Sequence, residues 1–177
     1  AIAGWPWGAY LGEDGVRNGV RAMVSSYRRA RIDTFMAKGK ICGQYVTNIL
    51  AKREALKLGF DEAIMLDTSG IACEGTGENL FLVKGGEVRT PPLGASILDG
   101  ITRATVLQLC RDMGVVVREE AFTRDELYTA DEVFMTGTAA EVTPVREIDH
   151  RMIGSGVPGV LTEKLKELYA TLVAGEQ

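Results

Sequence analysis

The pattern of apolar and polar residues predicts many short strands along the chain. Strands are typically short runs that are rich in β-branched and aromatic side chains and are bounded by Gly, Pro, Asn or Asp. Gly85-Gly86 predicts a hairpin turn, and Pro91-Pro92 ends the strand that follows it. The predicted strands are Val20–Tyr27, Glu62–Leu66, Ile71–Cys73, Asn79–Lys84, Glu87–Thr90, Val115–Arg118, Glu132–Met135 and Glu141–Arg146.

A helix is predicted from Ile41 to Leu58, because apolar residues recur there at four-residue spacing. Gly59 is expected to end this helix, since glycine accepts the left-handed conformation of a helix C-terminus. One apolar row consists of Ile41, Tyr45 and Ile49, and a second consists of Cys42, Val46 and Leu50. The polar face is expected to carry Lys52, Arg53, Glu54 and Lys57.

Further helices are predicted in the second half of the chain. Thr123 and Glu126 match a capping box, which predicts a short helix through Tyr128. A helix over Ile101–Met113 would place Val106, Leu109, Cys110 and Met113 on one face. A terminal helix over Pro158–Val173 would turn Leu161, Leu165, Leu168 and Leu172 inward. The elements together indicate a mixed α and β domain with more strands than helices.

Composition and charge exclude several classes of function. The 177 residues suit one domain, 46% of them are hydrophobic, and the net charge of −4 does not favour nucleic acid or an anionic membrane. No apolar run reaches the roughly 20 residues of a membrane span. The odd number of cysteines argues against a disulfide framework, and a single histidine, His150, argues against a zinc site or a Ser-His-Asp triad. Neither a dinucleotide-binding nor a P-loop glycine motif is present.

Four segments in order carry a resemblance to a known family. Together they resemble fold-type IV pyridoxal-phosphate enzymes, and most closely the branched-chain amino-acid aminotransferases. The resemblance implies an α+β fold, a β-rich pseudo-barrel with flanking helices, formed by one cofactor-binding domain over 1–177. Within it, residues 1–12 would be an interdomain loop; the family's smaller N-terminal domain is absent, so the chain is expected to be a fragment. The segments are WPWGAYLG (5–12), AKGKICGQYVTNILAKREA (37–55), CEGTGENLFLVK (73–84) with LDGITR (98–103), and DEVFMTGTAAEVTPVREID (131–149).

Two lysines precede the first predicted helix, and either amine could condense with an aldehyde. Such an amine must lose its proton, which burial or nearby positive charge promotes. From the segment alone, both Lys38 and Lys40 are equally well explained as solvated surface residues. The resemblance selects Lys40, since the family's cofactor-binding lysine lies five residues before the tyrosine that corresponds to Tyr45. It also implies that the Tyr45 hydroxyl binds the phenolic oxygen of pyridoxal 5'-phosphate.

A carboxylate must face the ring nitrogen of this cofactor to keep it protonated. Glu74 lies where a predicted strand meets Gly75-Thr76-Gly77, and it resembles the family's partner for that nitrogen. Glu78 lies four residues further on and is the competing candidate.

The remaining candidates would bind phosphate and substrate. Gly100, Ile101 and Thr102 begin a predicted helix, whose backbone N–H groups suit a phosphate. The resemblance adds Thr138 as a second phosphate contact, and it implies that the amides of Thr138, Ala139 and Ala140 hold the substrate carboxylate. Trp7 and Tyr10 resemble aromatic residues of the family's substrate pocket.

The resemblance implies transamination of leucine, isoleucine and valine with 2-oxoglutarate, giving 2-oxo acids and glutamate. D-amino-acid aminotransferase and aminodeoxychorismate lyase of the same fold are alternatives, as is a folded but inactive fragment. The implied setting is the cytoplasm, with a homo-oligomer (a dimer or hexamer) as the intact enzyme.

Overall fold

The computed structural model describes residues 2–4 and 10–175, except for the side chain of Glu13. Its elements follow the predicted order, with two additions, α1 and β9. The strands are β1 Val20–Arg28, β2 Glu62–Leu66, β3 Ala72–Glu74, β4 Asn79–Lys84, β5 Glu87–Thr90, β6 Val117–Glu119, β7 Glu132–Gly137, β8 Glu141–Ile148 and β9 Arg151–Met152. The helices are α1 Glu13–Asn18, η1 Cys42–Gln44 (a 3-10 helix), α2 Tyr45–Lys57, α3 Ile101–Asp112, α4 Arg124–Tyr128 and α5 Val160–Ala174.

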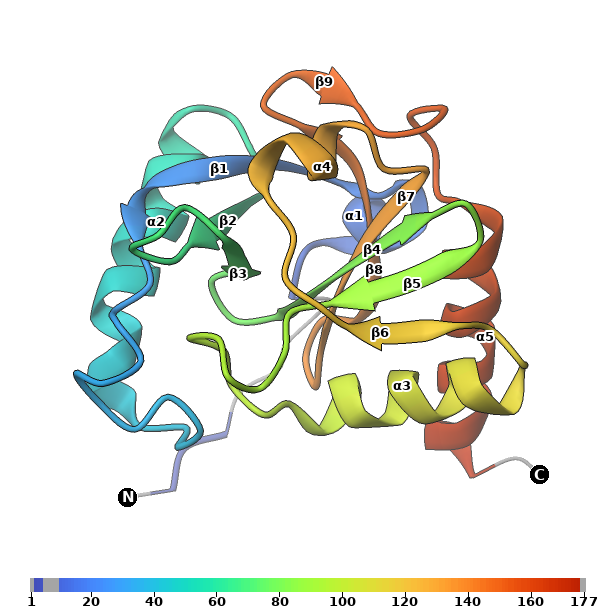
Figure 1. The fold of residues 1–177 in the computed structure, drawn as a ribbon, viewed down its shortest axis with the longest axis horizontal. Coiled ribbons are helices and arrows are strands. Elements are labelled where there is room, and N and C mark those ends of the chain that lie inside the picture. Colours follow the sequence, from blue (N-terminus) through green and yellow to red (C-terminus); the bar gives the residue numbers. More distant parts are fainter. Residues whose placement is uncertain (1, 5–9, 176–177) are drawn as a thin grey trace.

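The strands form one sheet that curls and closes on itself. Over the described residues its order is β3-β2-β1-β8-β7-β4-β5-β6, with β9 paired to β8. A further antiparallel pairing joins β3 to β4, where Glu74 lies opposite Asn79. This pairing closes a ring of six strands and leaves β5 and β6 as an extension. The α+β pseudo-barrel that the resemblance implies is therefore confirmed (Figure 1).

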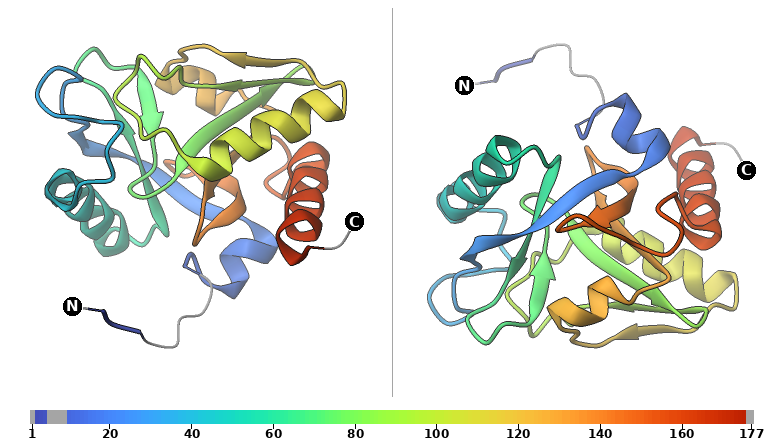
Figure 2. Two further views of the ribbon diagram at one scale, coloured as in Figure 1. Left: turned by 90° about the horizontal axis from the view of Figure 1, so that it is seen from below. Right: turned by 90° about the horizontal axis from the view of Figure 1, so that it is seen from above.

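Strands buried on both faces explain the continuous apolar runs in the sequence. Along β4, Leu80 and Leu82 point into the barrel core, whereas Phe81 and Val83 belong to a second core outside the ring. This second core is covered by α3 and α5, and α2 covers a third, smaller one against β1 and β2 (Figures 1 and 2). None of the helices in the described part is long and apolar enough to cross a membrane.

Several local predictions are confirmed. Gly85 and Gly86 both have positive φ, 57° and 81°, as a tight hairpin between β4 and β5 requires. Gly59 adopts φ 83° just after α2. Glu126 Oε2 accepts the backbone N–H of Thr123 at 2.8 Å, which completes the capping box at α4.

The predicted face of α2 is wrong, and that of α5 is wrong at one position. Helix α2 begins at Tyr45, and its buried residues are Asn48, Ala51 and Ala55, whereas the predicted apolar rows largely face outward. The alanines allow α2 to pack closely on β1 and β2, which leaves no room for the larger aliphatic side chains. In α5, Leu165 is buried and Leu161 packs against the second core as predicted, whereas Leu172 is exposed. Thr162 and Tyr169 are also buried. Within the two predicted apolar rows, the exposed aliphatic side chains are Ile41, Val46, Ile49 and Leu50.

Because Ala55 lies fully buried against the sheet, Ala55→Leu is expected to overpack this contact. We expect a loss of about 1–3 kcal/mol in the free energy of unfolding, measured by urea denaturation. The same substitution at exposed Ala170 in α5 is the matched control, and it is expected to change stability by less than about 0.5 kcal/mol. Equal effects at both positions would contradict the close packing of α2.

Candidate active site

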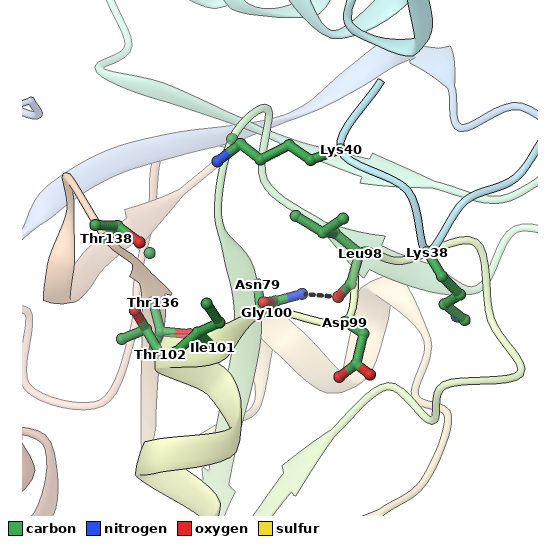
Figure 3. A pocket seen from close by; sticks show the side chains of 12 residues that line it. Lys38, Lys40, Asn79, Leu98, Asp99, Gly100, Ile101, Thr102, Thr136 and Thr138 are labelled. Carbon is green, nitrogen blue, oxygen red and sulfur yellow. Dashed lines mark hydrogen bonds between the residues drawn. The ribbon is translucent and has the colours of Figure 1, made fainter. Parts of the chain in front are cut away.

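Lys40 lies in the loop between β1 and η1 and lines a pocket of about 200 Å³. Its side chain extends across the pocket toward the side where Thr138 lies (Figure 3). Among the described residues, no group forms a hydrogen bond or an ion pair with its amine. The pocket is lined by Lys38, Lys40, Gly77, Asn79, Leu98, Asp99, Gly100, Ile101, Thr102, Thr136, Gly137 and Thr138.

Lys38 also borders this pocket, but its amine is directed elsewhere (Figure 3). It donates hydrogen bonds to the carbonyl oxygens of Leu93, of Ala95 at 3.4 Å and of Ile97 at 3.2 Å. Burial lowers the pKa of Lys38, while the nearby carboxylates of Asp99 and Glu74 oppose that shift. The geometry therefore separates the two lysines: one amine is occupied by carbonyls, and the other faces the pocket.

The N-terminus of α3 forms one wall of the pocket. Gly100 precedes the helix, and no side chain caps it, so the first N–H groups of α3 can bind an anion. A Cβ at Gly100 would lie 2.0 Å from Asn79 Oδ1, so any other residue here would have to displace the Asn79 side chain. Thr102 is buried, with its hydroxyl 3.4 Å from that of Tyr169.

The end of β7 also lines the pocket. Thr136 is buried, and its hydroxyl has no hydrogen-bond partner among the described residues. Thr138 follows at the exposed β7–β8 turn. Ala139 and Ala140 continue this turn outside the pocket lining, and the side chain of Ala140 packs into the barrel core.

Glu74, at the end of β3, is buried in an ion pair that sequence reasoning missed. Its Oε1 lies 2.9 Å from Arg29 Nη2, and both side chains are almost fully buried. Its Oε2 accepts the backbone N–H of Leu98 at 2.9 Å. Burial raises the pKa of Glu74 to about 7, although Arg29 opposes this shift. A buried carboxylate needs a cation, so a partner was to be expected; the sequence offers both Arg28 and Arg29 at the end of one strand.

Arg29 binds more than Glu74. Its Nη1 donates to Asn48 Oδ1 of α2 at 2.8 Å, and its Nε donates to the carbonyl oxygen of Ser96 at 3.0 Å. This side chain therefore joins β3, α2 and the segment that leads into α3.

Glu78 has different surroundings from Glu74. Its Oε2 accepts the N–H of Gly77 at 3.0 Å, but its Oε1 has no partner among the described residues. Burial and then the nearby Glu62 raise the pKa of Glu78. Glu62 itself is paired with Lys52 at 2.6 Å. Because Glu78 forms no ion pair within the described part of the chain, Glu74 is the better candidate for a carboxylate that acts in its ionised form.

Tyr45 and Glu74 line a smaller cavity that adjoins the Lys40 pocket. The two cavities share Gly77, Asn79 and Leu98 as lining residues. Burial, and then Glu74, raise the pKa of Tyr45. The amine of Lys40 and the carboxylate of Glu74 thus lie on neighbouring parts of one site.

The two predicted aromatic contacts differ in how far they can be placed. Tyr10 is half-buried against the barrel core, and a Cβ at Gly77 would lie 3.6 Å from its hydroxyl. Burial, and then Glu78, raise the pKa of Tyr10 to about 12. Trp7 lies outside the described residues.

The pocket combines a lysine amine, an uncapped helix N-terminus and a neighbouring buried carboxylate on a closed α+β sheet, as expected for a fold-type IV enzyme. The chain belongs to the amino-transferase class IV family, whose model matches residues 2–148. It is 48% identical over 175 residues to a branched-chain-amino-acid aminotransferase of Pseudomonas aeruginosa, covering 99% of this chain and 57% of that protein. The branched-chain-amino-acid aminotransferase of Escherichia coli strain K12 is 46% identical over 175 residues, again covering 99% of this chain and 57% of that protein.

Solved structures agree with this assignment. The branched-chain amino acid aminotransferase of Escherichia coli superposes with a TM-score of 0.95 at 45% identity, covering 98% of this chain and 57% of that one. The enzyme from Thermobaculum terrenum, solved in its PLP form, superposes with a TM-score of 0.87 at 37% identity, covering 89% of this chain and 52% of that one. The chain therefore spans little more than half the length of these relatives.

The pairing of Arg29 with Glu74 predicts a pH-dependent cost for Arg29→Met. Without the guanidinium, ionised Glu74 would be buried unpaired, whereas protonated Glu74 needs no cation. The pKa of Glu74 in the folded chain is raised to about 7. The electrostatic part of the stability lost in Arg29→Met is therefore absent well below pH 7 and grows as the pH rises above 7. We expect a loss of about 3 kcal/mol at pH 8.5 and about 1–2 kcal/mol less at pH 5.5, from urea denaturation.

The control for this experiment is the double variant Arg29→Met with Glu74→Gln. It removes the titrating carboxyl, so its stability relative to Glu74→Gln should not change between the two pH values. A pH-independent cost of the single variant would show that Glu74 does not titrate in this range.

Proposed function

We propose that this chain is the cofactor-binding part of a pyridoxal-phosphate-dependent branched-chain aminotransferase. The observation that carries the proposal is the amine of Lys40, which faces the uncapped N-terminus of α3 across one pocket. The relatives' names supply the substrate class. Because the chain covers only 57% of their length, we propose this activity for the whole protein of which the chain is a part. The remaining length would supply the smaller N-terminal domain.

The donor set suits pyridoxal phosphate, which carries an aldehyde, a phosphate and a ring nitrogen. Lys40 offers an amine without a partner in the described structure, and Gly100, Ile101 and Thr102 offer the N–H groups of an uncapped helix. The unpartnered hydroxyl of Thr136 and the exposed Thr138 line the same pocket. Glu74 offers a buried carboxylate that Arg29 helps to keep ionised. When bound, this cofactor supplies an electron-accepting ring that stabilises negative charge at the substrate's α-carbon.

Each residue then has a defined task. The amine of Lys40 would hold the cofactor and would act at the substrate's α-carbon as general base and then acid. Glu74 would face the ring nitrogen and favour its protonated form, and the hydroxyl of Tyr45 would bind the phenolic oxygen. The N-terminus of α3 and Thr138 would bind the phosphate.

The substrates proposed are leucine, isoleucine and valine, with 2-oxoglutarate as amino acceptor. The amides of Thr138, Ala139 and Ala140 bind the substrate carboxylate, and Trp7 and Tyr10 line the side-chain pocket. An apolar pocket distinguishes chains by only about 1–3 kcal/mol per methylene, so all three amino acids should react. We further propose that the intact enzyme is a cytoplasmic homo-oligomer.

Borohydride trapping tests the role of Lys40. With pyridoxal phosphate, reduction and peptide mapping should place the label on Lys40, and Lys40→Met should remove both the label and the visible absorption band. Loss of this amine should lower kcat by at least about 10²–10⁴-fold. Lys57→Met changes an exposed lysine of α2 and is the matched control, which should leave label and rate unchanged. Labelling of Lys38 instead would contradict the assignment.

An activity screen on the full-length protein tests the substrate class. Transfer from L-leucine to 2-oxoglutarate is the expected reaction. Reaction with D-alanine alone, or release of pyruvate from aminodeoxychorismate, would assign the site to one of the two alternatives of the same fold.

A further inference from the structure

The segment 93–99 contacts Glu74 and Asn79 and leads directly into α3. The backbone N–H of Leu98 donates to Glu74 at 2.9 Å, and the carbonyl oxygen of Leu98 accepts from Asn79 Nδ2 at 2.9 Å. Two residues later, Gly100 begins the N-terminus of α3. A shift of this segment would therefore move the partner of Glu74 and the N–H groups of α3 together.

The loop that carries Lys40 forms hydrogen bonds with this segment at two places. At its start, Arg29 and Ala30 bind Ser96: Arg29 Nε donates to the Ser96 carbonyl, and the Ser96 hydroxyl donates to the Ala30 carbonyl at 2.8 Å. Close to Lys40, the amine of Lys38 donates to three carbonyls of the segment, those of Leu93, Ala95 and Ile97. The contacts of Arg29 and Ala30 with Ser96 lie beside buried Glu74. The contacts of Lys38 lie at the surface, two residues from Lys40.

We infer that Lys38 is a positioning residue: its ammonium ties the Lys40 loop to segment 93–99 and so sets the spacing between the Lys40 amine, Glu74 and the α3 N-terminus. The inference rests on the function proposed above. Lys38 suits this task because an ammonium has three donors and no acceptor, which matches three converging carbonyls. Its amine points away from the pocket, so it acts on the chemistry only through the segments that it joins (Figure 3).

The charges around Lys38 support the same conclusion. Asp99 and Glu74 face it from segment 93–99 and β3, and Arg103 faces it from α3. Lys38 also adds positive potential at Glu74, although less than Arg29 does. Its bonds are partly exposed, so its loss should loosen this junction while leaving most of the global stability intact.

Hydrogen exchange in the cofactor-free, full-length protein tests directly whether Lys38 holds segment 93–99 in place. In Lys38→Met, the hydrogen-bonded backbone amides of Ala95, Ile97 and Leu98 should exchange about five- to tenfold faster than in the wild type. Amides of β7 and β8 should stay unchanged, as should all of these amides in the control Lys57→Met. Lys38→Arg, which keeps a multiple donor, should restore exchange to within about twofold of wild type.

Cofactor retention gives the second measurement. Pyridoxal phosphate should dissociate several-fold faster from Lys38→Met than from wild type, with Lys38→Arg restoring slow release. Wild-type exchange of the Ala95, Ile97 and Leu98 amides in Lys38→Met, or equal acceleration in β7 and β8, would overturn the inference. Failure to label Lys40 in the wild type would instead overturn the proposed function, because the exchange measurement needs no cofactor.

Discussion

The buried ion pair between Arg29 and Glu74 is the interaction on which the site depends. Two charges removed from water are costly unless they are paired and hydrogen-bonded, and these two are both. Glu74 takes the guanidinium on one oxygen and the Leu98 N–H on the other, while Arg29 also binds Asn48 and Ser96. The pair thus fixes the end of β3 against α2 and against the segment leading into α3. A carboxylate that is held this way can remain ionised where burial alone would protonate it.

Closure of the sheet brings these parts together. In the described structure, the register between β3 and β4 consists of one pair, Glu74 opposite Asn79. Their side chains both bind Leu98, since Glu74 accepts its N–H and Asn79 donates to its carbonyl. Asn79 also fills the space that a side chain at Gly100 would need. The residues that complete the ring therefore also align the start of α3, so the barrel and the site form as one unit.

Local patterns predicted the elements of this fold well and the faces of its helices less well. The Gly85-Gly86 hairpin, the Thr123–Glu126 capping box and helix α3 follow from contacts within a few residues. The orientation of α2 does not: the large aliphatic residues favoured one face, but the small Ala51 and Ala55 fit against β1 and β2. The role of Arg29 was not predicted, because its partners Asn48, Glu74 and Ser96 are distant in sequence. The resemblance selected Lys40 over Lys38, a choice that spacing alone left open.

The two lysines and the two glutamates show how environment divides equivalent groups. Lys38 and Lys40 are two residues apart, yet three carbonyls occupy one amine while the other faces the pocket. Glu74 and Glu78 lie four residues apart and are both buried, yet only Glu74 has a guanidinium beside it. Since Glu78 has Glu62 nearby instead, ionisation costs it more. The chemistry available at each position is therefore set by what the fold brings to it, and residue type alone does not decide it.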